Sequence, residues 1–404
     1  MDLLTIAERI ASMDRSPLEF NAEACLHSLD KYASCEACYD ICPVDAIQAG
    51  KPPSFDNEQC QTCLACLPAC PVGAYTAVDN VPALLNSVVR SNRKTIELVC
   101  QVHAKIEAGP RQSDLAIRVR GCLASLGIGT YLLLVAMEIE NIILRMDACD
   151  QCPWVSLKIH IEKQLSIARK ILTPSGRADR LQSITDLSAM EKHERPVWIA
   201  ENPPLSRRDL FRITSYMALP QVLQSLSSGQ RQIGNDRLSQ DRRRVLAAVA
   251  HLANPDQQDE VAVLDETGFA TLTISDACTA CGVCARACPC GAITFNHSHD
   301  KKFQLSFTPQ ACIVCEICVN ICQPDAITLD PKPSFKDVFG SRSSKLLHEG
   351  ELTRCKNCHV LMAAKPGINL CAICEFRQKN PFGSALPPGY KGPFKIPKPD
   401  EGSR

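Results

Sequence analysis

The middle of the chain carries a hydrophobic pattern that predicts alternating strands and helices. Short apolar runs at Thr95–Cys100, Ala116–Cys122 and Asn141–Met146 predict strands. Longer apolar segments at Leu123–Ile139 and Ser156–Leu172 predict helices, the second with apolar residues near helical spacing. Strands that alternate with helices are typical of a small α/β domain with a mainly parallel sheet, which we expect over residues 91–175.

The most apolar of these segments invites a membrane interpretation. Leu123–Ile139 is interrupted by Glu138 and followed by Glu140, and a spanning helix needs about 20 apolar residues. We therefore expect a buried helix and no membrane span.

Beyond this domain the pattern becomes weaker. Composition turns polar after Pro174-Ser175-Gly176, and a helix is predicted at about Asn235–Ala253, with Asn235 as its candidate N-cap. We expect a helical connector over residues 176–265. The last segment, residues 379–404, is rich in Pro, Gly and Lys, which predicts a disordered tail.

A repeated unit stands on either side of the α/β domain. Each copy has a cysteine-rich loop, a tight turn and a short apolar segment fit for a strand. The copies are Cys42-Pro-Val-Asp-Ala-Ile, Cys70-Pro-Val-Gly-Ala-Tyr, Cys288-Pro-Cys-Gly-Ala-Ile and Cys322-Gln-Pro-Asp-Ala-Ile. Their arrangement in two pairs predicts two modules, over residues 1–80 and 266–335.

The cysteine spacing of the second module predicts two [4Fe–4S] clusters. A Cys-x-x-Cys-x-x-Cys loop supplies three thiolates to one cluster, and the fourth cysteine of each run ligates the other cluster. We name the two expected ligand sets site E, which is Cys278, Cys281, Cys284 and Cys322, and site D, which is Cys288, Cys312, Cys315 and Cys318. Structural zinc is the alternative, and zinc sites seldom use this spacing.

The first module has one complete run and one incomplete run. The complete set, site B, is Cys42, Cys60, Cys63 and Cys66. The other, site A, has Cys35, Cys38 and the crossing Cys70, but Tyr32 stands where its first thiolate is expected. Cys25, seven residues upstream of Tyr32, is the predicted substitute. Two alternatives stay open: a three-iron or labile cluster, and Cys25 as a buried inert thiol. His27 is a less favoured ligand.

These runs resemble the bacterial-type dicluster ferredoxins and the polyferredoxin subunits of larger redox enzymes. The resemblance covers roughly residues 25–80 and 270–330, and it implies low-potential one-electron transfer through four [4Fe–4S] clusters. Two positions depart from the family pattern: Tyr32, and Gln323 in place of proline after Cys322. The first puts the composition of site A in doubt, and the second affects only a turn.

A further set of cysteines lies at predicted strand ends in the α/β domain. Site C comprises Cys100, Cys122, Cys149 and Cys152. The carboxyl ends of parallel strands gather at one edge, where ligands commonly bind. The arrangement is similar to the delta subunit of methyl-viologen-reducing hydrogenase, and that resemblance implies a [2Fe–2S] cluster. The final pair has two intervening residues where the family has four, and ordinary buried cysteines remain the alternative.

The last cysteine set predicts a zinc ribbon over residues 351–378. The ribbon site is Cys355, Cys358, Cys371 and Cys374, two Cys-x-x-Cys pairs separated by twelve residues. A rubredoxin-like single iron uses the same ligands. Cys355-Lys-Asn-Cys358-His359 also matches a c-type haem attachment pattern, which would leave Cys371 and Cys374 without a role. One zinc is the favoured interpretation.

Composition and charge narrow the function classes. Cysteine accounts for 25 of the 404 residues, and the six sites use all but Cys290. Clustered Cys-x-x-Cys pairs suit metals rather than disulfides, and together with an N-terminus unlike a signal peptide they predict a cytoplasmic protein. The 44 basic and 44 acidic residues cancel, so we expect no nucleic-acid or lipid partner.

Three other sequence patterns resemble functional motifs, but we assign none of them a binding or export function. Ser206–Arg212 resembles a twin-arginine export motif but is internal. Arg242-Arg243-Arg244 is interpreted as a solvated helix face. Gly127-Ile-Gly129 has no third glycine in phase, so it is no nucleotide fingerprint, and no small-molecule substrate is evident.

The sequence thus predicts an α+β multidomain chain in which two ferredoxin-like dicluster modules flank a small α/β domain, with a C-terminal zinc-ribbon-like pair of knuckles. The leading hypothesis is an electron-transfer subunit that relays single electrons to or from a redox protein partner. The delta-subunit resemblance implies a hydrogenase, heterodisulfide reductase or formate dehydrogenase as that partner. Two alternatives stay open: a catalytic oxidoreductase acting through the α/β domain, and a redox- or oxygen-sensing regulatory or assembly protein.

Overall fold

The computed structural model describes residues 18–103, 106, 108–188, 192–204, 238–252, 264, 266–298, 301–340 and 344–380. Three sequence features therefore lie outside the described residues: the candidate N-cap Asn235, the twin-arginine-like string at 206–212, and nearly all of the predicted tail at 379–404.

The predicted α/β domain is built on a five-stranded sheet in which every pairing is parallel. The strand order is β11-β7-β5-β8-β9. The strands are β5 (Thr95–Val99), β7 (Leu115–Arg118), β8 (Asn141–Arg145), β9 (Leu181–Ile184) and β11 (Val197–Ile199). The predicted strands and the parallel sheet are confirmed, although β7 is shorter than expected.

Two strands of this sheet have no clear signal in the sequence. β9 and β11 form its two edges, and β10 (Lys192–Glu194) pairs with β6 (Ala108–Pro110) in an antiparallel ribbon. All of β9, β10 and β11 lie in the segment predicted as a helical connector, so that prediction is wrong for residues 181–184, 192–194 and 197–199. Strands of three or four residues carry too little periodicity to be recognised, and their pairing partners define them.

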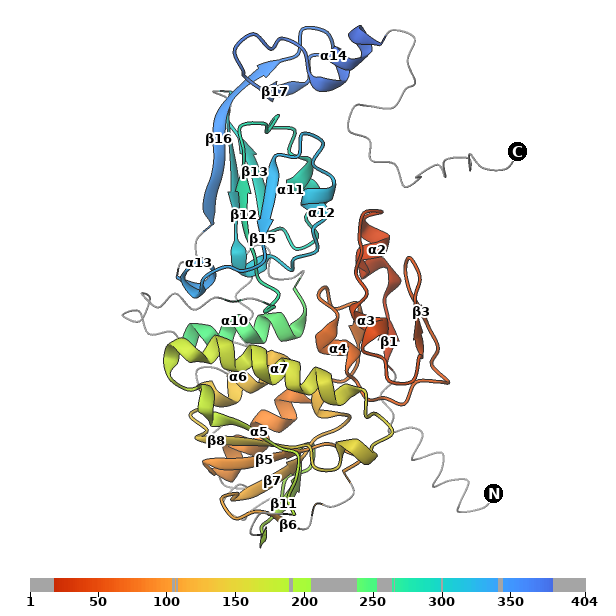
Figure 1. The fold of residues 1–404 in the computed structure, drawn as a ribbon, viewed down its shortest axis with the longest axis vertical. Coiled ribbons are helices and arrows are strands. Elements are labelled where there is room, and N and C mark those ends of the chain that lie inside the picture. Colours follow the sequence, from red (N-terminus) through yellow and green to blue (C-terminus); the bar gives the residue numbers. More distant parts are fainter. Residues whose placement is uncertain are drawn as a thin grey trace, which may run out of the picture.

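The helices α6 (Gly127–Ala136) and α7 (Leu157–Leu172) lie on one face of the sheet, and β6 lies on the other (Figure 1). The predicted long helix over 123–139 is a 3₁₀ turn at Leu123–Ser125 followed by α6. Its side chains are almost all buried, as expected for a core helix. Among the described residues no helix is long and apolar enough to cross a membrane.

Helix α10 (Gln240–Leu252) packs directly on α6, and two glycines permit this close approach. A Cβ at Gly127 would lie 2.3 Å from Oδ1 of Asp241, and one at Gly129 would lie 2.5 Å from the Cβ of Arg244. The Gly129 N–H donates to Asp241 Oδ1 at 2.9 Å. Gly127 and Gly129 therefore allow α10 to pack against the N-terminus of α6.

The buried carboxyl of Asp241 should make the stability of the fold depend on pH. Burial raises the pKa of Asp241 to about 6, above the value near 4 expected in the unfolded chain. Because the folded state binds this proton more tightly, its contribution to stability falls as pH rises from about 4 to about 7. Asn keeps the acceptor for Gly129, so we expect Asp241→Asn to stabilise by about 1–3 kcal/mol at pH 7.5 and by about half as much at pH 5. Anaerobic denaturant unfolding at both pH values measures this, and a pH-independent difference contradicts it.

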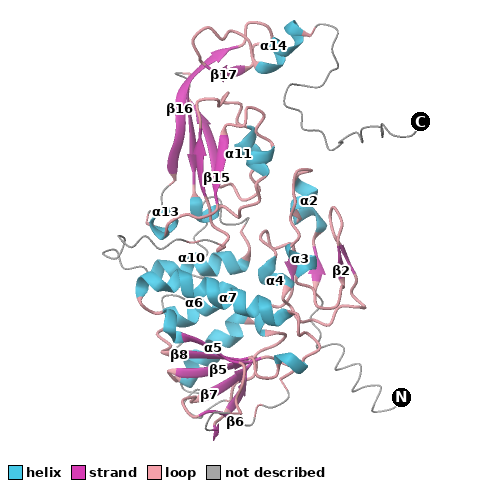
Figure 2. Ribbon diagram, in the orientation of Figure 1, coloured by secondary structure: helices cyan, strands magenta, loops and turns pink. Residues whose placement is uncertain are grey.

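The first module is mostly loop with short helices and two-residue strand pairs (Figure 2). It leads into α5 (Val81–Ser91), the first element of the α/β domain. Its elements are β1 (Glu19–Phe20), α2 (Leu26–Leu29), α3 (Ala37–Asp40), β2 (Ile47–Gln48), β3 (Ser54–Phe55), α4 (Cys66–Ala69) and β4 (Tyr75–Thr76).

The second module is larger because a four-stranded antiparallel sheet extends it towards the ribbon. β14 pairs with β13 and with the long strand β16, which continues into the ribbon segment (Figure 1). The elements are β12 (Thr271–Ile274), α11 (Val283–Ala287), β13 (Ile293–His297), β14 (Lys302–Phe307), α12 (Ile317–Asn320), β15 (Ile327–Asp330), α13 (Phe335–Phe339), β16 (Lys345–Arg354), β17 (Leu361–Ala363) and α14 (Ala372–Lys379).

Candidate metal centres

The three complete cysteine runs share one loop geometry. The first cysteine sulfur of each accepts a backbone N–H from two residues later: Thr62 to Cys60 at 3.5 Å, Ala280 to Cys278 at 3.4 Å and Val314 to Cys312 at 3.5 Å. Each of these three donors has a positive φ, and so does the residue two positions further on: Leu64, Gly282 and Glu316. Left-handed non-glycine residues are uncommon and mark functional loops, here loops that turn N–H groups inward around the thiols.

The fourth cysteine of three runs is held in a second repeated way. Its sulfur accepts the N–H from four residues later: Ala74 to Cys70 at 3.2 Å, Ala292 to Cys288 at 3.2 Å and Ala326 to Cys322 at 3.3 Å. Hydrogen bonds to ligand sulfurs favour the negatively charged state of a bound iron–sulfur cluster. The sequence marks these donors only by the alanine that recurs four residues after the last cysteine of each run. Its residue type does not reveal the role, because any residue other than proline supplies a backbone N–H.

The thiols of sites D and E gather as the crossover pattern predicts. Cys322 interacts electrostatically with Cys278 and Cys284, and Cys288 with Cys315 and Cys318. Cys284 also interacts with Cys318, so the two sites adjoin. Cys281 is exposed, which puts site E at the surface of the molecule.

The first module gathers its cysteines in the same two sets. Cys42 interacts with Cys63 and Cys66, as expected for site B. Cys25 is buried at the start of α2 and interacts with all three other members of site A, which are Cys35, Cys38 and Cys70.

The neighbouring candidate ligand His27 is held next to site A. Its Nε2 donates to the backbone carbonyl of Cys35 at 2.7 Å, while its Nδ1 is buried and has no hydrogen-bond partner, so Nδ1 stays available as an alternative ligand atom. The first run also lacks the left-handed geometry of the others, since Glu36 has φ −121° where they have a positive φ. Cys25 therefore approaches from a separate turn, which explains why it falls outside the regular spacing.

The raised pKa values of these thiols indicate that a cation is needed if they are to be thiolates together. Burial raises the pKa of Cys38 and of Cys63 to about 11, and that of Cys284 to about 12. Several converging thiolates without a cation would therefore be unfavourable. Iron supplies the positive charge that such a set needs, and thiolates are its preferred ligands in iron–sulfur clusters. The donor sets of the ferredoxin modules fit [4Fe–4S] clusters.

Site C lies where the sheet changes its winding direction. β5 leads to β7 on one side and the chain then crosses to β8 on the other, so the switch point is at the carboxyl ends of β5 and β8. Cys100 follows β5, and Cys149 follows β8. Cys100 interacts with Cys152, and Cys122 with Cys100 and Cys149, so the four thiols face one region.

Hydrogen bonds connect the residues of site C directly to the loop of site B. The Cys122 N–H donates to the Cys63 carbonyl at 3.0 Å, and the Trp154 indole N–H donates to Gln61 Oε1 at 2.8 Å. A Cβ at Gly121 would lie 2.8 Å from the Cys63 carbonyl oxygen, and its φ is +72°. Only glycine fits this turn, and it brings the two sites into contact.

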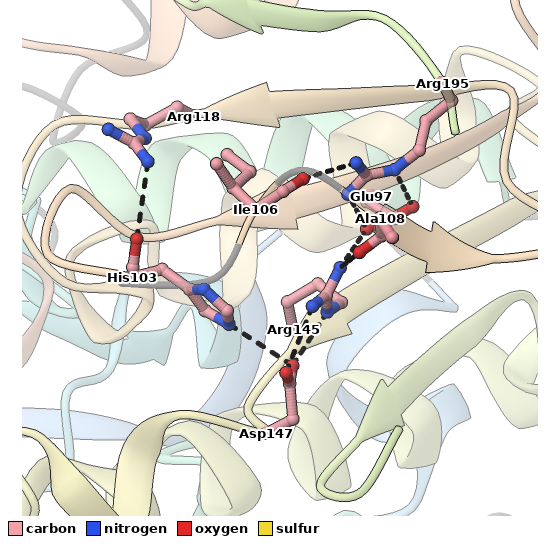
Figure 3. Close-up of polar contacts among 8 residues, drawn as sticks. All are labelled: Glu97, His103, Ile106, Ala108, Arg118, Arg145, Asp147 and Arg195. Carbon is pink, nitrogen blue, oxygen red and sulfur yellow. Dashed lines mark hydrogen bonds and ion pairs between the residues drawn. The ribbon is translucent and has the colours of Figure 1, made fainter. Parts of the chain in front are cut away.

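A buried ionic network links β5 and β8, two of the three strands whose ends carry site C (Figure 3). On β5 the side chains alternate, so Ile96 and Leu98 face the helices and Glu97 faces the opposite side. Glu97 is fully buried and accepts hydrogen bonds from Arg145 at 2.7 Å and from Arg195 at 2.7 Å. The sequence prediction did not include this network, although a carboxylate inside an apolar parallel strand is its visible signal.

The network continues to the loops of site C. Arg145 donates to both carboxylate oxygens of Asp147, and His103 Nε2 lies 3.2 Å from Asp147 Oδ1. Burial alone would raise the pKa of Glu97, but its hydrogen bonds, first from Arg195, hold that pKa below the usual value. His103 and Asp147 stand close in sequence to Cys100 and Cys149. The network therefore fixes both loops at the ends of β5 and β8.

The ribbon site is the most compact cysteine set. Its four sulfurs, those of Cys355, Cys358, Cys371 and Cys374, lie within 4.8 Å of one another. The Cys371 N–H donates to Cys355 Sγ at 3.3 Å, and Asn357 Nδ2 donates to Cys374 Sγ at 3.3 Å. The backbone N–H groups of Cys358 and Cys371 lower the pKa of Cys355 to about 6, which favours the thiolate. This donor set fits one tetrahedral metal ion.

The ribbon also rests on the loop of site E. The Ala363 N–H donates to the Thr279 carbonyl at 3.0 Å, and Lys365 Nζ donates to the Asp276 carbonyl at 2.5 Å. Both acceptors flank Cys278 in the sequence. The ribbon therefore supports the outermost cluster loop.

Replacing one ribbon ligand should separate the metal types. We expect Cys371→Ser to remove about one zinc per chain and to leave the iron content unchanged, because zinc needs the complete tetrahedral set. Elemental analysis of the anaerobically purified variant measures both metals. Loss of one iron with no change in zinc would instead assign a rubredoxin-like centre.

The arginine triplet on α10 is not a solvated face. Arg243 is exposed, but Arg242 reaches into the second module and Arg244 pairs with Asp79. Together with Asp241, which binds α6, these residues tie α10 to three parts of the chain. The interpretation from sequence was wrong because arginine stems can cross apolar surface to reach buried acceptors.

Comparison with known proteins places one part of the chain in a family. Residues 277–326 match the family model of the 4Fe-4S dicluster domain. No curated protein and no solved structure matches the chain. The matched residues include every cysteine of sites D and E, and they define an iron–sulfur protein with a ferredoxin-like module. The dicluster domain supports iron–sulfur electron transfer as the activity of this class.

Proposed function

We propose that the chain is a linear relay of single electrons, with its sites in the spatial order E, D, A, B, C. The observation that carries this proposal is the junction between the two modules. Leu26 and Ala33 of the first module form one buried apolar cluster with Ile317 of the second, and Cys35 of site A and Cys315 of site D both pack against it. Clusters at these two sites would be neighbours although their ligands are far apart in sequence.

Contacts at the other steps support the same order. Sites E and D adjoin through Cys284 and Cys318, and sites B and C through the Cys63–Cys122 hydrogen bond. Tyr75 lies between sites A and B, since it interacts with thiols of both. The four ferredoxin sites would hold [4Fe–4S] clusters and site C a [2Fe–2S] cluster, and the clusters supply the electron chemistry. The protein's own residues position them, exclude water and set their potentials.

The two ends of the relay suit contact with other redox proteins. Site E is exposed at Cys281, and Val102 and Val155 beside site C are exposed apolar residues. We propose that the chain works as an electron-transfer subunit of a larger oxidoreductase of the hydrogenase, heterodisulfide reductase or formate dehydrogenase type, in the cytoplasm, with zinc in the ribbon. The resemblance of the middle domain to the hydrogenase delta subunit motivates this choice of partners.

Anaerobic redox titration followed by EPR tests the relay. We expect reversible one-electron reduction of every cluster, with signals broadened or split by magnetic interaction between neighbouring reduced clusters. The purified chain alone should turn over no substrate. Magnetically isolated clusters, or substrate turnover without a partner, would contradict the proposal.

A further inference from the structure

Arg242 brings a positive charge from α10 to one cluster site. Its Nη2 donates to the backbone carbonyl of Cys312 at 2.6 Å and its Nε to that of Gln310 at 3.3 Å. The guanidinium carbon lies 3.3 Å from the centre of the Phe269 ring. Burial lowers the pKa of Arg242 to about 10, so the group stays charged at neutral pH.

A second polar group reaches the same site. Cys290, which no ligand set uses, is 1% exposed, and its sulfur lies 3.8 Å from that of Cys288. When Cys288 is a ligand it is a thiolate, so the Cys290 S–H is the donor of this contact. Site D thus has a fixed cation and a thiol donor in addition to the backbone N–H of Ala292.

The neighbouring sites have less positive surroundings. Each has a nearby carboxylate: Asp40 lies near Cys35 of site A, and Asp325 lies near Cys322 of site E. The cation near Cys278 is Lys365, and its amine donates to the backbone carbonyl of Asp276, which is outside the ligand set, whereas Arg242 donates to the carbonyl of a ligand cysteine. A charge that lies closer to a cluster stabilises the reduced state of that cluster more.

We propose that the cluster of site D is more oxidising than the adjoining clusters of sites A and E and that Arg242 sets its potential, assisted by Cys290. The inference rests on the proposed function, since it requires a cluster at site D. Reduction takes the cluster core from 2+ to 1+ with one electron from the neighbouring cluster, and a fixed positive charge stabilises the added negative charge. An electron that enters from either end would therefore be held longest at site D, at the junction between the two modules.

Potentials of single clusters in the full chain test this inference. In an EPR-monitored anaerobic titration, we expect Arg242→Gln to decrease the equilibrium constant for reduction of one cluster by about tenfold, which is about 59 mV for one electron. Arg242→Lys should keep most of the potential, because it keeps the charge. Cys290→Ala should produce a smaller shift in the same cluster, and Cys290→Ser, which retains a donor, a smaller one still.

The matched control is Arg243→Gln, which removes an equal charge from the exposed side of the same helix and should shift no potential. If Arg242→Gln fails to assemble its clusters, the Lys and Cys290 variants carry the test. An unchanged potential in Arg242→Gln, or an equal shift in Arg243→Gln, overturns the inference while four clusters are still present. A wild-type chain that binds no cluster at site D overturns the proposed function instead.

Discussion

Cys25→Ser is expected to lose one [4Fe–4S] cluster or to convert it to a three-iron form. Cys25 is buried among Cys35, Cys38 and Cys70, and Tyr32 leaves the regular run one thiolate short. Serine is nearly isosteric but is a far poorer ligand for iron, so the fold should survive while site A loses about four iron atoms, or one if a three-iron cluster remains. Anaerobic iron analysis and EPR of the oxidised protein distinguish these outcomes.

The control for this variant is Cys290→Ser, which changes a buried cysteine that we assign to no ligand set. It should keep the wild-type iron content. Unchanged iron and EPR in Cys25→Ser would show that Cys25 is an inert thiol, and site A would then need a ligand other than cysteine.

Glu97→Gln is expected to destabilise the α/β domain strongly. It leaves Arg195 without its carboxylate partner and removes one of the two carboxylates that Arg145 binds. Removal of one member of a buried ion pair costs about 3–5 kcal/mol, because the remaining charge stays buried. The loops that carry Cys100 and Cys149 depend on the same network, so site C should lose its metal at lower denaturant concentrations than the other sites. Denaturant unfolding of the anaerobic protein, followed by circular dichroism and visible absorbance, measures both effects.

An exposed carboxylate gives the comparison for Glu97. Glu138 pairs with Arg177 and Arg180, but its side chain is 55% exposed, so Glu138→Gln should change stability by less than about 1 kcal/mol. The pKa of Glu97 in the folded protein is below its usual value, so the ionised carboxylate stabilises the fold at neutral pH. This stabilisation is lost as pH falls through the lowered pKa of the folded state. Equal effects of the two substitutions would mean that the network contributes little.

Much of the fold could be predicted because the local patterns are strong. Strands β5 and β8 and helix α7 were predicted within one residue of their observed ends, since each is continuous and apolar or shows helical periodicity. β9 and β11 could not be predicted, because residues such as Gln182 and Ser183 give no strand period and only the neighbouring strands define them.

The ligand sets could be predicted more completely than their arrangement. Crossover ligation follows from spacing along one chain, so the members of sites B, D and E follow directly from the sequence. The junction of Leu26 with Ile317 could not be predicted, because it joins segments almost three hundred residues apart. Arg242 was misjudged for a similar reason: its acceptors are backbone carbonyls of a distant loop, which have no residue-type signal.

The iron, sulfide and zinc content of the anaerobically purified chain is the most direct test of the multi-site relay. Four [4Fe–4S] clusters, one [2Fe–2S] cluster and one ribbon metal predict about 18 iron atoms, about 18 sulfides and one zinc per chain. A value near 12 iron atoms, reproduced after cluster reconstitution, equals the loss of one [4Fe–4S] cluster and the [2Fe–2S] cluster. It would contradict the assignments of one first-module site and of site C and would break the relay between its two ends.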